Sequence, residues 1–137
     1  MKELVKARIT YVVDDNKLTV EDFLSLVNNI WTGNYEPKLV EEALQKTINI
    51  TAWDNQQLIG CVRILTDGYF FGTVPEILVL PSYQGKGIGK QLMELVWDVS
   101  PTSLFFGSQP GKEEFFEKLG YTKSIQSFQK RKERRKL

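Results

Sequence analysis

A glycine-rich loop between an apolar strand pattern and an amphipathic helix pattern constrains the fold of this chain more than any other feature. Three glycines alternate in Gln84-Gly85-Lys86-Gly87-Ile88-Gly89. The aliphatic run 76–80 before them is typical of a strand, and residues 88–99 after them repeat apolar side chains with a helical period. Glycine allows positive φ angles and close approach of a ligand to the backbone. The free N–H groups at the helix start, with Lys86 and Lys90 nearby, predict a phosphate site.

The spacing of the glycines excludes two common phosphate loops. A P-loop requires four residues between its first glycine and the Gly-Lys pair, whereas three separate Gly85 from Gly89. Gln91 also stands where a P-loop needs Ser or Thr. The dinucleotide fingerprint places its third glycine where this chain has Lys90. A simple tight turn stays an alternative, although three glycines exceed what a turn needs.

The other periodicities predict one mixed α/β domain without repeats or linkers. Three- and four-residue spacing favours helices over 20–31, 37–47, 88–99 and 112–119, with Thr19 capping the first. Pro75 predicts a bulge or an edge within a long strand, because proline removes a ladder hydrogen bond. β-branched and aromatic residues favour strands over 8–13, 48–53, 58–65, 69–80, 103–106 and 121–128.

Positive charge is concentrated at the C-terminus. Residues 130–136 hold six Lys or Arg side chains and one acid, whereas the rest of the chain holds 12 basic and 16 acidic residues. Such a run is typical of an arm that binds nucleic acid or an anionic surface, or of a solvated terminus. No aromatic residue is interleaved in it, so we favour the solvated terminus and expect no nucleic-acid partner. The expected organisation is one domain over 1–129 and a basic tail over 130–137.

Histidine is absent from the chain, and Cys61 is its single cysteine. These counts exclude Ser-His-Asp triads, imidazole bases and a Cys/His zinc cluster, so we expect no metal site. The strand setting of Cys61, between Gly60 and Val62, favours a buried core residue over a nucleophile. A lone thiol, no signal-peptide pattern and no apolar run near ~20 residues favour a cytoplasmic protein without a membrane span.

Two motifs, in this order, resemble those of the GNAT superfamily of acyl-CoA-dependent N-acyltransferases. Residues 84–89 are similar to the family's Gln/Arg-x-x-Gly-x-Gly/Ala pyrophosphate loop at every defined position, and 76–81 looks like the fourth strand leading into it. Residues 115–121, Phe-Phe-Glu-Lys-Leu-Gly-Tyr, resemble the later Phe-Tyr-x-x-x-Gly-Phe signature. The resemblance covers nearly the whole chain except its first residues and the basic tail. It implies an α/β (α+β) fold with a mixed, mostly antiparallel, V-split central sheet and about four flanking helices.

The resemblance also implies where acetyl-CoA would bind. It would lie between the fourth and fifth strands, with its pyrophosphate on the backbone amides of residues 84–89. The backbone of Val79 would pair with the pantetheine arm, and Phe116 would lie near the thioester. The implied cosubstrate-binding residues are Leu78, Val79, Gln84, Gly85, Lys86, Gly87, Ile88, Gly89, Lys90 and Phe116.

In this family an amine attacks the thioester directly, so neither histidine nor a cysteine nucleophile is needed. We expect Glu76 to deprotonate the ammonium, directly or through water, with a surface glutamate of no chemical role as the alternative. N–H groups near Leu78 and Val79 would stabilise the oxyanion. Family members often carry a tyrosine at the position of Phe116 to protonate the leaving thiolate. The hydroxyls that could replace it are those of Tyr121, Tyr83 and Ser108.

The expected function is transfer of an acetyl group from acetyl-CoA to a primary amine of a small molecule. A non-catalytic acyl-CoA-binding or regulatory module is one alternative, because Phe116 has no proton to donate. Acetylation of a protein amine, guided by the basic tail, is another, and a homodimer stays open. Trp31, Tyr35 and Trp53 would form either an aromatic acceptor pocket or part of the core.

Overall fold

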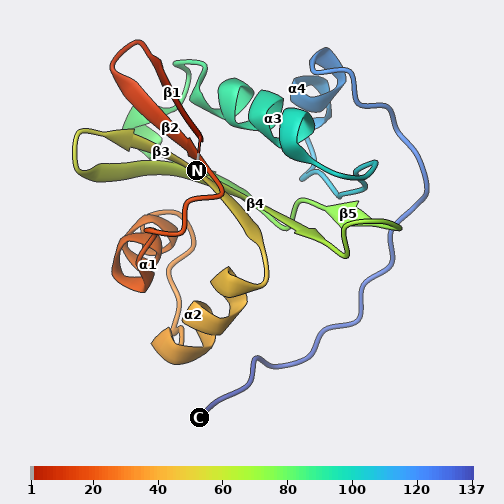
Figure 1. Ribbon diagram of the computed structural model, residues 1–137. Helices are drawn as coiled ribbons and strands as arrows, with labels where there is room; N and C mark the ends of the chain where they lie inside the picture. Colours follow the sequence, from red (N-terminus) through yellow and green to blue (C-terminus); the bar gives the residue numbers. More distant parts are fainter. Residues whose placement is uncertain (1) are drawn as a thin grey trace.

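An antiparallel six-stranded sheet runs through the middle of the molecule, seen here in a computed structural model that describes residues 2–137 (Figure 1). Helices α1 and α2 cover one face, and α3 covers the other with α4 beside it (Figure 1). The predicted mixed α/β fold is therefore confirmed. The elements are β1 Lys2–Lys6, β2 Ile9–Val13, α1 Val20–Asn28, α2 Pro37–Gln45, β3 Ile48–Asp54, β4 Gln57–Thr66, β5 Gly72–Thr73, β6 Ile77–Val79, α3 Ile88–Val99 and α4 Glu113–Lys118.

Strand β4 organises the sheet because it pairs with three other strands. The order is β1-β2-β3-β4-β5, and β6 pairs with a different part of β4 than β5 does. Gly60, Cys61 and Val62 of β4 face β6, whereas Leu65 and Thr66 face β5. The sheet thus divides at β4 into a β6 branch, which leads to the glycine loop, and a β5 branch.

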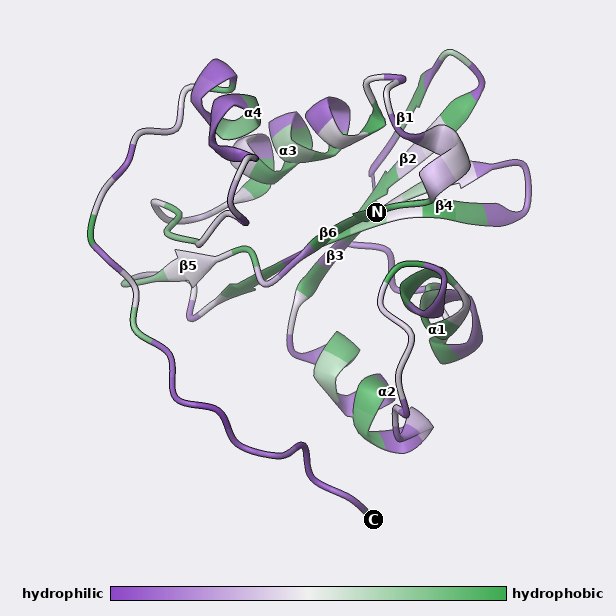
Figure 2. Cartoon of the chain, turned by 180° about the vertical axis from the view of Figure 1, so that it is seen from behind, coloured by the Kyte–Doolittle hydropathy of each residue, from purple (hydrophilic) through white to green (hydrophobic). Residues whose placement is uncertain are grey.

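The hydrophobic core lies on both faces of β3 and β4. Figure 2 shows this centre of the sheet as the hydrophobic part of the chain and the C-terminal segment as hydrophilic. Along β4, residues 58–62 are buried without interruption, which is typical of a strand covered by helices on both sides. Each helix adds an apolar stripe at helical spacing. Side chains with no exposed surface include Ile50, Ile59, Val62, Ile64, Leu92 and Val96.

Two of the predicted strands are wrong. Residues 103–106 form no strand, and one backbone bond from Phe105 N to Gly72 O, 3.0 Å, links them to β5. Residues 121–128 are also outside every strand, and the side chains of Ile125 and Phe128 are 79% and 95% exposed. Ile125 and Phe128 are three positions apart, with polar residues between them, so in a strand their side chains would point to opposite faces. No single face of such a strand could then be buried.

The predicted long strand over 69–80 is divided in two. β5 ends at Thr73 and β6 begins at Ile77, so the irregularity predicted from Pro75 is a complete interruption of the strand. Residues before β5 belong to a turn, in which Asp67 Oδ1 accepts from the N–H groups of residues 69–71 at 2.8–3.1 Å. These bonds hold the pKa of Asp67 below its ordinary value. The interruption leaves Glu76 at the entrance to β6.

The N-terminal strand β1 was not predicted, because its five residues are polar-rich and all are exposed. It pairs with β2 through a two-residue connection, Ala7 and Arg8. Helix α1 begins as predicted, with Thr19 Oγ1 accepting from Asp22 N at 3.1 Å, but ends at Asn28. No helix within residues 2–137 is both long and apolar enough to cross a membrane.

Candidate acetyl-CoA site

Strand β6 has one paired edge and one edge that no other strand of the described chain covers. Leu80 N donates to Ile59 O of β4 at 2.9 Å, and Leu78 pairs with Cys61. Because antiparallel ladders alternate, the backbone groups of Leu78 also face β4, whereas those of Ile77 and Val79 face outward. This geometry leaves the Val79 N–H, and not the Leu78 N–H, available at the outer edge. Gln84 Nε2 donates to the Val79 carbonyl at 3.0 Å.

The glycine loop follows β6 through a single 3₁₀ turn at Pro81–Tyr83. Gly85 and Gly87 adopt left-handed conformations, with φ of 77° and 82°, and Gly87 is the residue from which α3 begins. The first bond that closes α3 runs from Gln91 N to Gly87 O, 3.0 Å. The N–H groups of the first turn therefore have no partner inside the helix, and that turn contains no acidic residue. The loop is suited to an anion.

An aromatic cluster lies beside this strand and loop. Phe116 of α4 packs against Phe106 and Phe115 with ring centroids 4.9 and 5.0 Å apart, and against Tyr121 at 6.3 Å. A Cβ added to Gly89 would contact Phe115 at 3.6 Å, which places α4 directly against the start of α3. The structure therefore brings Phe116 to the same region as the loop and β6.

The Tyr121 hydroxyl is buried without a hydrogen-bond partner, alone in this among the buried side-chain polar atoms of residues 2–137. Burial also raises the pKa of Tyr121 above its ordinary value, so the group keeps its proton. A buried hydroxyl without a partner costs about 1–3 kcal/mol. The hydroxyl is therefore a free donor within the aromatic cluster, and the outward edge of β6 and the glycine loop are the parts that fit acetyl-CoA.

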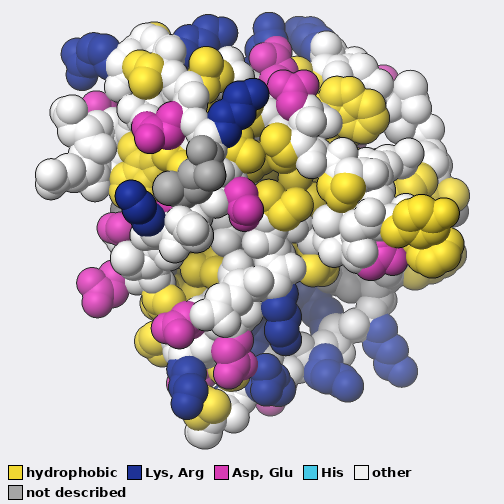
Figure 3. All heavy atoms as spheres, viewed as in Figure 1, with side chains coloured by type: hydrophobic (Ala, Val, Ile, Leu, Met, Phe, Trp, Pro, Cys, Tyr) yellow, Lys and Arg dark blue, Asp and Glu magenta, His cyan; other side chains and the backbone are white. Residues whose placement is uncertain are grey.

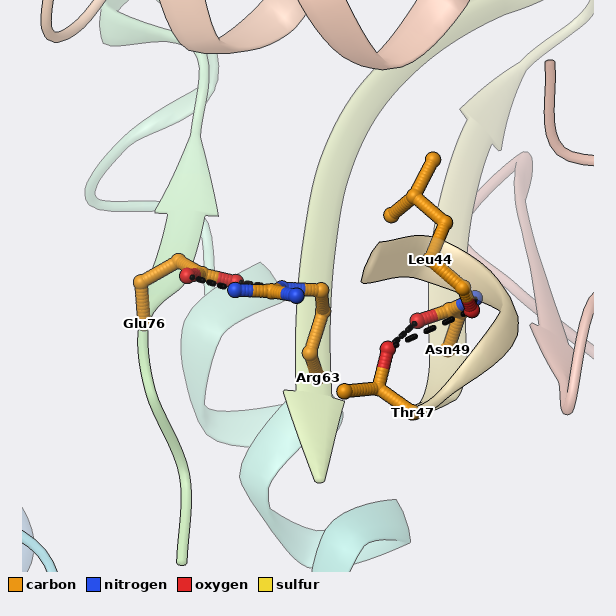
Figure 4. A network of polar contacts seen from close by, with 5 residues as sticks. All are labelled: Leu44, Thr47, Asn49, Arg63 and Glu76. Carbon is orange, nitrogen blue, oxygen red and sulfur yellow. Dashed lines mark hydrogen bonds and ion pairs between the residues drawn. The ribbon is translucent and has the colours of Figure 1, made fainter. Parts of the chain in front are cut away.

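Glu76 is held by an arginine. Arg63 of β4 meets its carboxylate with two nitrogens, Nε to Oε2 and Nη2 to Oε1, the latter at 2.7 Å (Figure 4). Only 17% of the Arg63 side chain and 13% of the Glu76 side chain are exposed. Burial works against the charged guanidinium, but the hydrogen bond and charge of Glu76 outweigh it, so the pKa of Arg63 is raised. A carboxylate has about four lone-pair sites, so two remain for another donor.

Several other residues singled out in the sequence make structural contacts of their own. Cys61 is 1% exposed, and burial raises the pKa of its thiol, so it is a core residue as predicted. The Trp53 indole N–H donates to Thr51 Oγ1 at 2.8 Å, in a network with buried Asp15. Tyr35 donates to the carbonyl of Trp31 at 2.8 Å.

Two residues of this neighbourhood had little sequence signal. Arg63 is the one charged residue of β4, and its partner Glu76 lies 13 residues later in the sequence, beyond the turn that follows β4. An isolated Arg inside a strand pattern was the one available indication of a buried ion pair. Tyr121 is one of three candidate hydroxyls in the sequence, and only the structure reveals that its hydroxyl is buried without a partner.

Comparison with known proteins connects this geometry with one family. The family model described as "Acetyltransferase (GNAT) domain" matches residues 45–123, more than half of the chain. Among curated relatives, histone acetyltransferase TAP1 of Glycine max is 38% identical over 74 residues, covering 50% of this chain. The chain spans only 31% of the length of that relative.

Solved structures share the fold at low sequence identity. A GNAT family acetyltransferase from Streptococcus pneumoniae TIGR4 has a TM-score of 0.73 at 23% identity, covering 90% of this chain and 99% of its own. AAC(6')-Iy, solved with the bisubstrate analogue CoA-S-monomethyl-acetylneamine, has a TM-score of 0.72 at 19% identity, covering 93% and 99%. The matched family model spans β4, β6, the glycine loop and the aromatic cluster. The chain therefore belongs to the GNAT acetyltransferase family.

Proposed function

We propose that this protein transfers an acetyl group from acetyl-CoA directly to a primary amine of a small molecule. The observation that carries the proposal is the continuity of the outward edge of β6 with the unpartnered N–H groups of the glycine loop. One feature binds an extended amide-containing arm, and the other binds a pyrophosphate at its end. Membership of the GNAT family supports the same assignment.

The chain's contribution to the reaction begins with positioning. The N–H groups of residues 85–90 hold the pyrophosphate, and the backbone of Val79 pairs with the pantetheine arm once the Gln84 side chain moves off its carbonyl. Acetyl-CoA supplies the activated acetyl thioester. The outward Val79 N–H is the donor best placed for the oxyanion, because the Leu78 N–H faces β4. The protein would hold acetyl-CoA and the amine side by side. The reaction then proceeds within one complex instead of between two free molecules, which lowers the activation barrier.

Proton movement is assigned to two side chains. Glu76 accepts a proton from the acceptor ammonium, directly or through water, using lone pairs that Arg63 leaves available. The amine nitrogen then bonds to the acetyl carbon and the carbon–sulfur bond breaks, while the nitrogen loses a second proton to water, which balances the proton given to the sulfur. Tyr121 donates to the departing sulfur in place of the hydroxyl that Phe116 lacks. Tyr83 is less suited, because its hydroxyl donates to Asp54 at 2.5 Å, and Ser108 lies in an exposed loop.

The class of acceptor is the least constrained part of the proposal. A relative named as a histone acetyltransferase keeps a protein amine as the second candidate, and the basic tail would then serve the protein–protein encounter. A purely acyl-CoA-binding module is the third, because Phe116 lacks a hydroxyl. The cytoplasmic location and a homodimer stay predictions.

The test combines binding with turnover. Isothermal calorimetry with acetyl-CoA is followed by thiol release across a panel of small amines and one lysine-rich peptide. We expect binding, and turnover with at least one small amine that Glu76→Gln reduces about 100-fold or more, the usual scale for loss of a general base. No binding at millimolar acetyl-CoA would sink the proposal. Binding without turnover on any acceptor would favour the non-catalytic module, and turnover on the peptide alone would favour the protein acceptor.

A further inference from the structure

The glycine loop is tied to the sheet by the side chain of Tyr83. Tyr83 is the last residue of the 3₁₀ turn before the loop, and its hydroxyl donates to Asp54 Oδ2 at 2.5 Å. Asp54 is the last residue of β3, 29 positions earlier in the sequence. A hydroxyl–carboxylate bond of this length is charge-assisted and stronger than a bond between neutral groups. The same bond raises the pKa of Tyr83 above its ordinary value, so the hydroxyl keeps the proton that it shares with Asp54.

Asp54 is a fixed point to which the loop can be tied. Its backbone pairs with Ile9 of β2 on one side and with Gln57 of β4 on the other. Its second carboxylate oxygen, Oδ1, lies 3.9 Å from Arg8 Nη2. Only 17% of the Asp54 side chain is exposed, so the carboxylate is held between the sheet and the loop.

The loop itself has few other contacts. Its two left-handed glycines have open space where a Cβ would lie. Among residues 81–87, the side chains that hydrogen-bond within the described chain are those of Tyr83 and Gln84. Gln84 donates to the Val79 carbonyl, which the pantetheine arm would take, so this bond is lost when acetyl-CoA binds. The bond between Tyr83 and Asp54 is then the remaining side-chain hydrogen bond that holds the loop.

The charge of Asp54 has the wrong sign for a residue beside an anion site. Asp54 lines a cavity of about 810 Å³ at the loop, together with Arg8, Lys86 and a second acid, Glu94. By electrostatics alone, a carboxylate at this place would weaken the binding of an anionic pyrophosphate. The bond to Tyr83 can offset this repulsion, because it sets the position of the loop that supplies the N–H donors.

We propose that the hydrogen bond between Tyr83 and Asp54 positions the glycine loop for the pyrophosphate of acetyl-CoA. This inference rests on the proposed function. Asp54 is a positioning residue, which acts through Tyr83 and does not touch the cosubstrate. The bond keeps the N–H groups of residues 85–90 directed at one anion, and the Tyr83 ring holds Lys86, whose Nζ lies 5.4 Å from the ring centre. Without the bond, the loop must be ordered at the moment of binding, which lowers the affinity.

Calorimetry of acetyl-CoA binding to the full chain tests this inference by the sign of each effect. We expect Tyr83→Phe and Asp54→Ala each to weaken binding about tenfold, the lower end of what a hydrogen bond to a charged group contributes. Asp54→Asn keeps an oxygen that accepts from Tyr83 and removes the charge, so its affinity should equal or exceed that of the wild type. Glu94→Gln, which removes the other acid of the cavity lining, is the matched control and should not weaken binding.

Two further measurements separate positioning from other roles. In the Tyr83→Phe background, Asp54→Ala should cause no further loss of affinity, because the two residues act through one bond. At saturating acetyl-CoA and amine, kcat of each single variant should stay within about twofold of the wild type, since neither side chain reaches the reacting atoms. The thermal midpoint of each variant without ligand is measured alongside.

The contrary outcomes separate this inference from the proposed function. Tighter binding by Asp54→Ala would show that its charge alone matters, and additive losses in the double variant would show that the two residues act separately; either result overturns the inference. A lower thermal midpoint with unchanged affinity would make the bond purely structural, and a lower kcat with unchanged affinity would make Tyr83 a catalytic residue; both also overturn it. Wild-type binding that no variant changes would overturn this inference alone, whereas a wild-type chain that binds no acetyl-CoA would overturn the proposed function as well.

Discussion

Arg63 and Glu76 form a largely buried ion pair whose two members depend on each other. Removing one of them leaves the other as an uncompensated charge with little access to water. We predict that Arg63→Ala lowers the free energy of unfolding by about 2–4 kcal/mol, measured by urea denaturation. The variant Arg63→Gln/Glu76→Gln should lose less than Arg63→Ala, because it leaves no buried charge. A loss below about 0.5 kcal/mol in Arg63→Ala would show that the pair is a surface contact.

Tyr121 and Phe116 exchange the residues that the family signature places at these two positions. The Tyr121 hydroxyl makes no bond within the described chain, so removing it should not destabilise the fold. We predict that Tyr121→Phe keeps or slightly raises the thermal midpoint and lowers kcat for acetyl transfer about tenfold or more, with acetyl-CoA affinity unchanged.

The matched variant adds the hydroxyl at the position where the signature has it. Phe116→Tyr in the Tyr121→Phe background should recover part of the lost kcat, because the two rings are neighbours at 6.3 Å. Unchanged kcat in Tyr121→Phe would contradict the assigned role, and a lower thermal midpoint with unchanged kcat would make the residue a structural one.

At the element scale, the start of α3 depends on the conformations of its glycines. Gly87 has a φ of 82° with open space around it, so a methyl group there meets no atom and acts through backbone strain alone. Gly89 lies inside the helix, where alanine is preferred and the new Cβ would make an ordinary contact with Phe115. We predict that Gly87→Ala lowers the free energy of unfolding by about 1–2 kcal/mol, whereas Gly89→Ala raises it by up to about 1 kcal/mol.

Thermal unfolding of the two variants without ligand tests this prediction, because each is the control for the other. Equal effects of the same sign would show that the loop is not held in the left-handed conformation. Acetyl-CoA affinity should fall in Gly87→Ala, since the strain displaces N–H groups from the anion site.

The sequence predicted elements well where local signals and burial agree. The loop, α3 and the hairpin of β3 and β4 combine strong periodicity with recognisable turns, and they were placed within a few residues. Residues 103–106 and 121–128 have β-favouring side chains, but a strand also needs a partner and a buried face, which a local pattern does not contain. β1 was missed for the opposite reason, because its pairing with β2 overrides a polar sequence.

In the candidate site, too, local features were predictable from the sequence and tertiary contacts were not. The residues of the loop were predictable because glycine spacing is a local property. The contact between Arg63 and Glu76, the orphaned hydroxyl of Tyr121 and the arrival of Arg8 beside Lys86 all depend on the tertiary fold. Their side chains come from different elements, and no spacing along the chain encodes that proximity.

At the scale of the whole molecule, charge is divided between an acidic body and a basic tail. Figure 3 shows Lys and Arg side chains gathered at the lower margin, over the C-terminal segment. The tail touches the body through exposed contacts. Arg135 Nη2 lies 3.8 Å from Glu42 Oε2, and Arg134 Cζ lies 5.2 Å from the centre of the Tyr35 ring. Contacts of this kind are worth about 1 kcal/mol or less each, so the tail contributes little to folding.

Deleting residues 130–137 should therefore act on encounter rates and not on the fold. The net charge changes from +1 to −4, and acetyl-CoA is an anion, so the truncated protein attracts it less. We predict that kcat/KM for acetyl-CoA falls severalfold at low salt and that the difference disappears near 1 M salt, where charges are screened beyond about 3 Å. The thermal midpoint should be unchanged. A full-length variant with the six basic residues replaced by glutamine should behave like the deletion, because charge and not chain length is responsible. A difference that persists at high salt would contradict this explanation and would indicate a short-range contact between the tail and the cosubstrate.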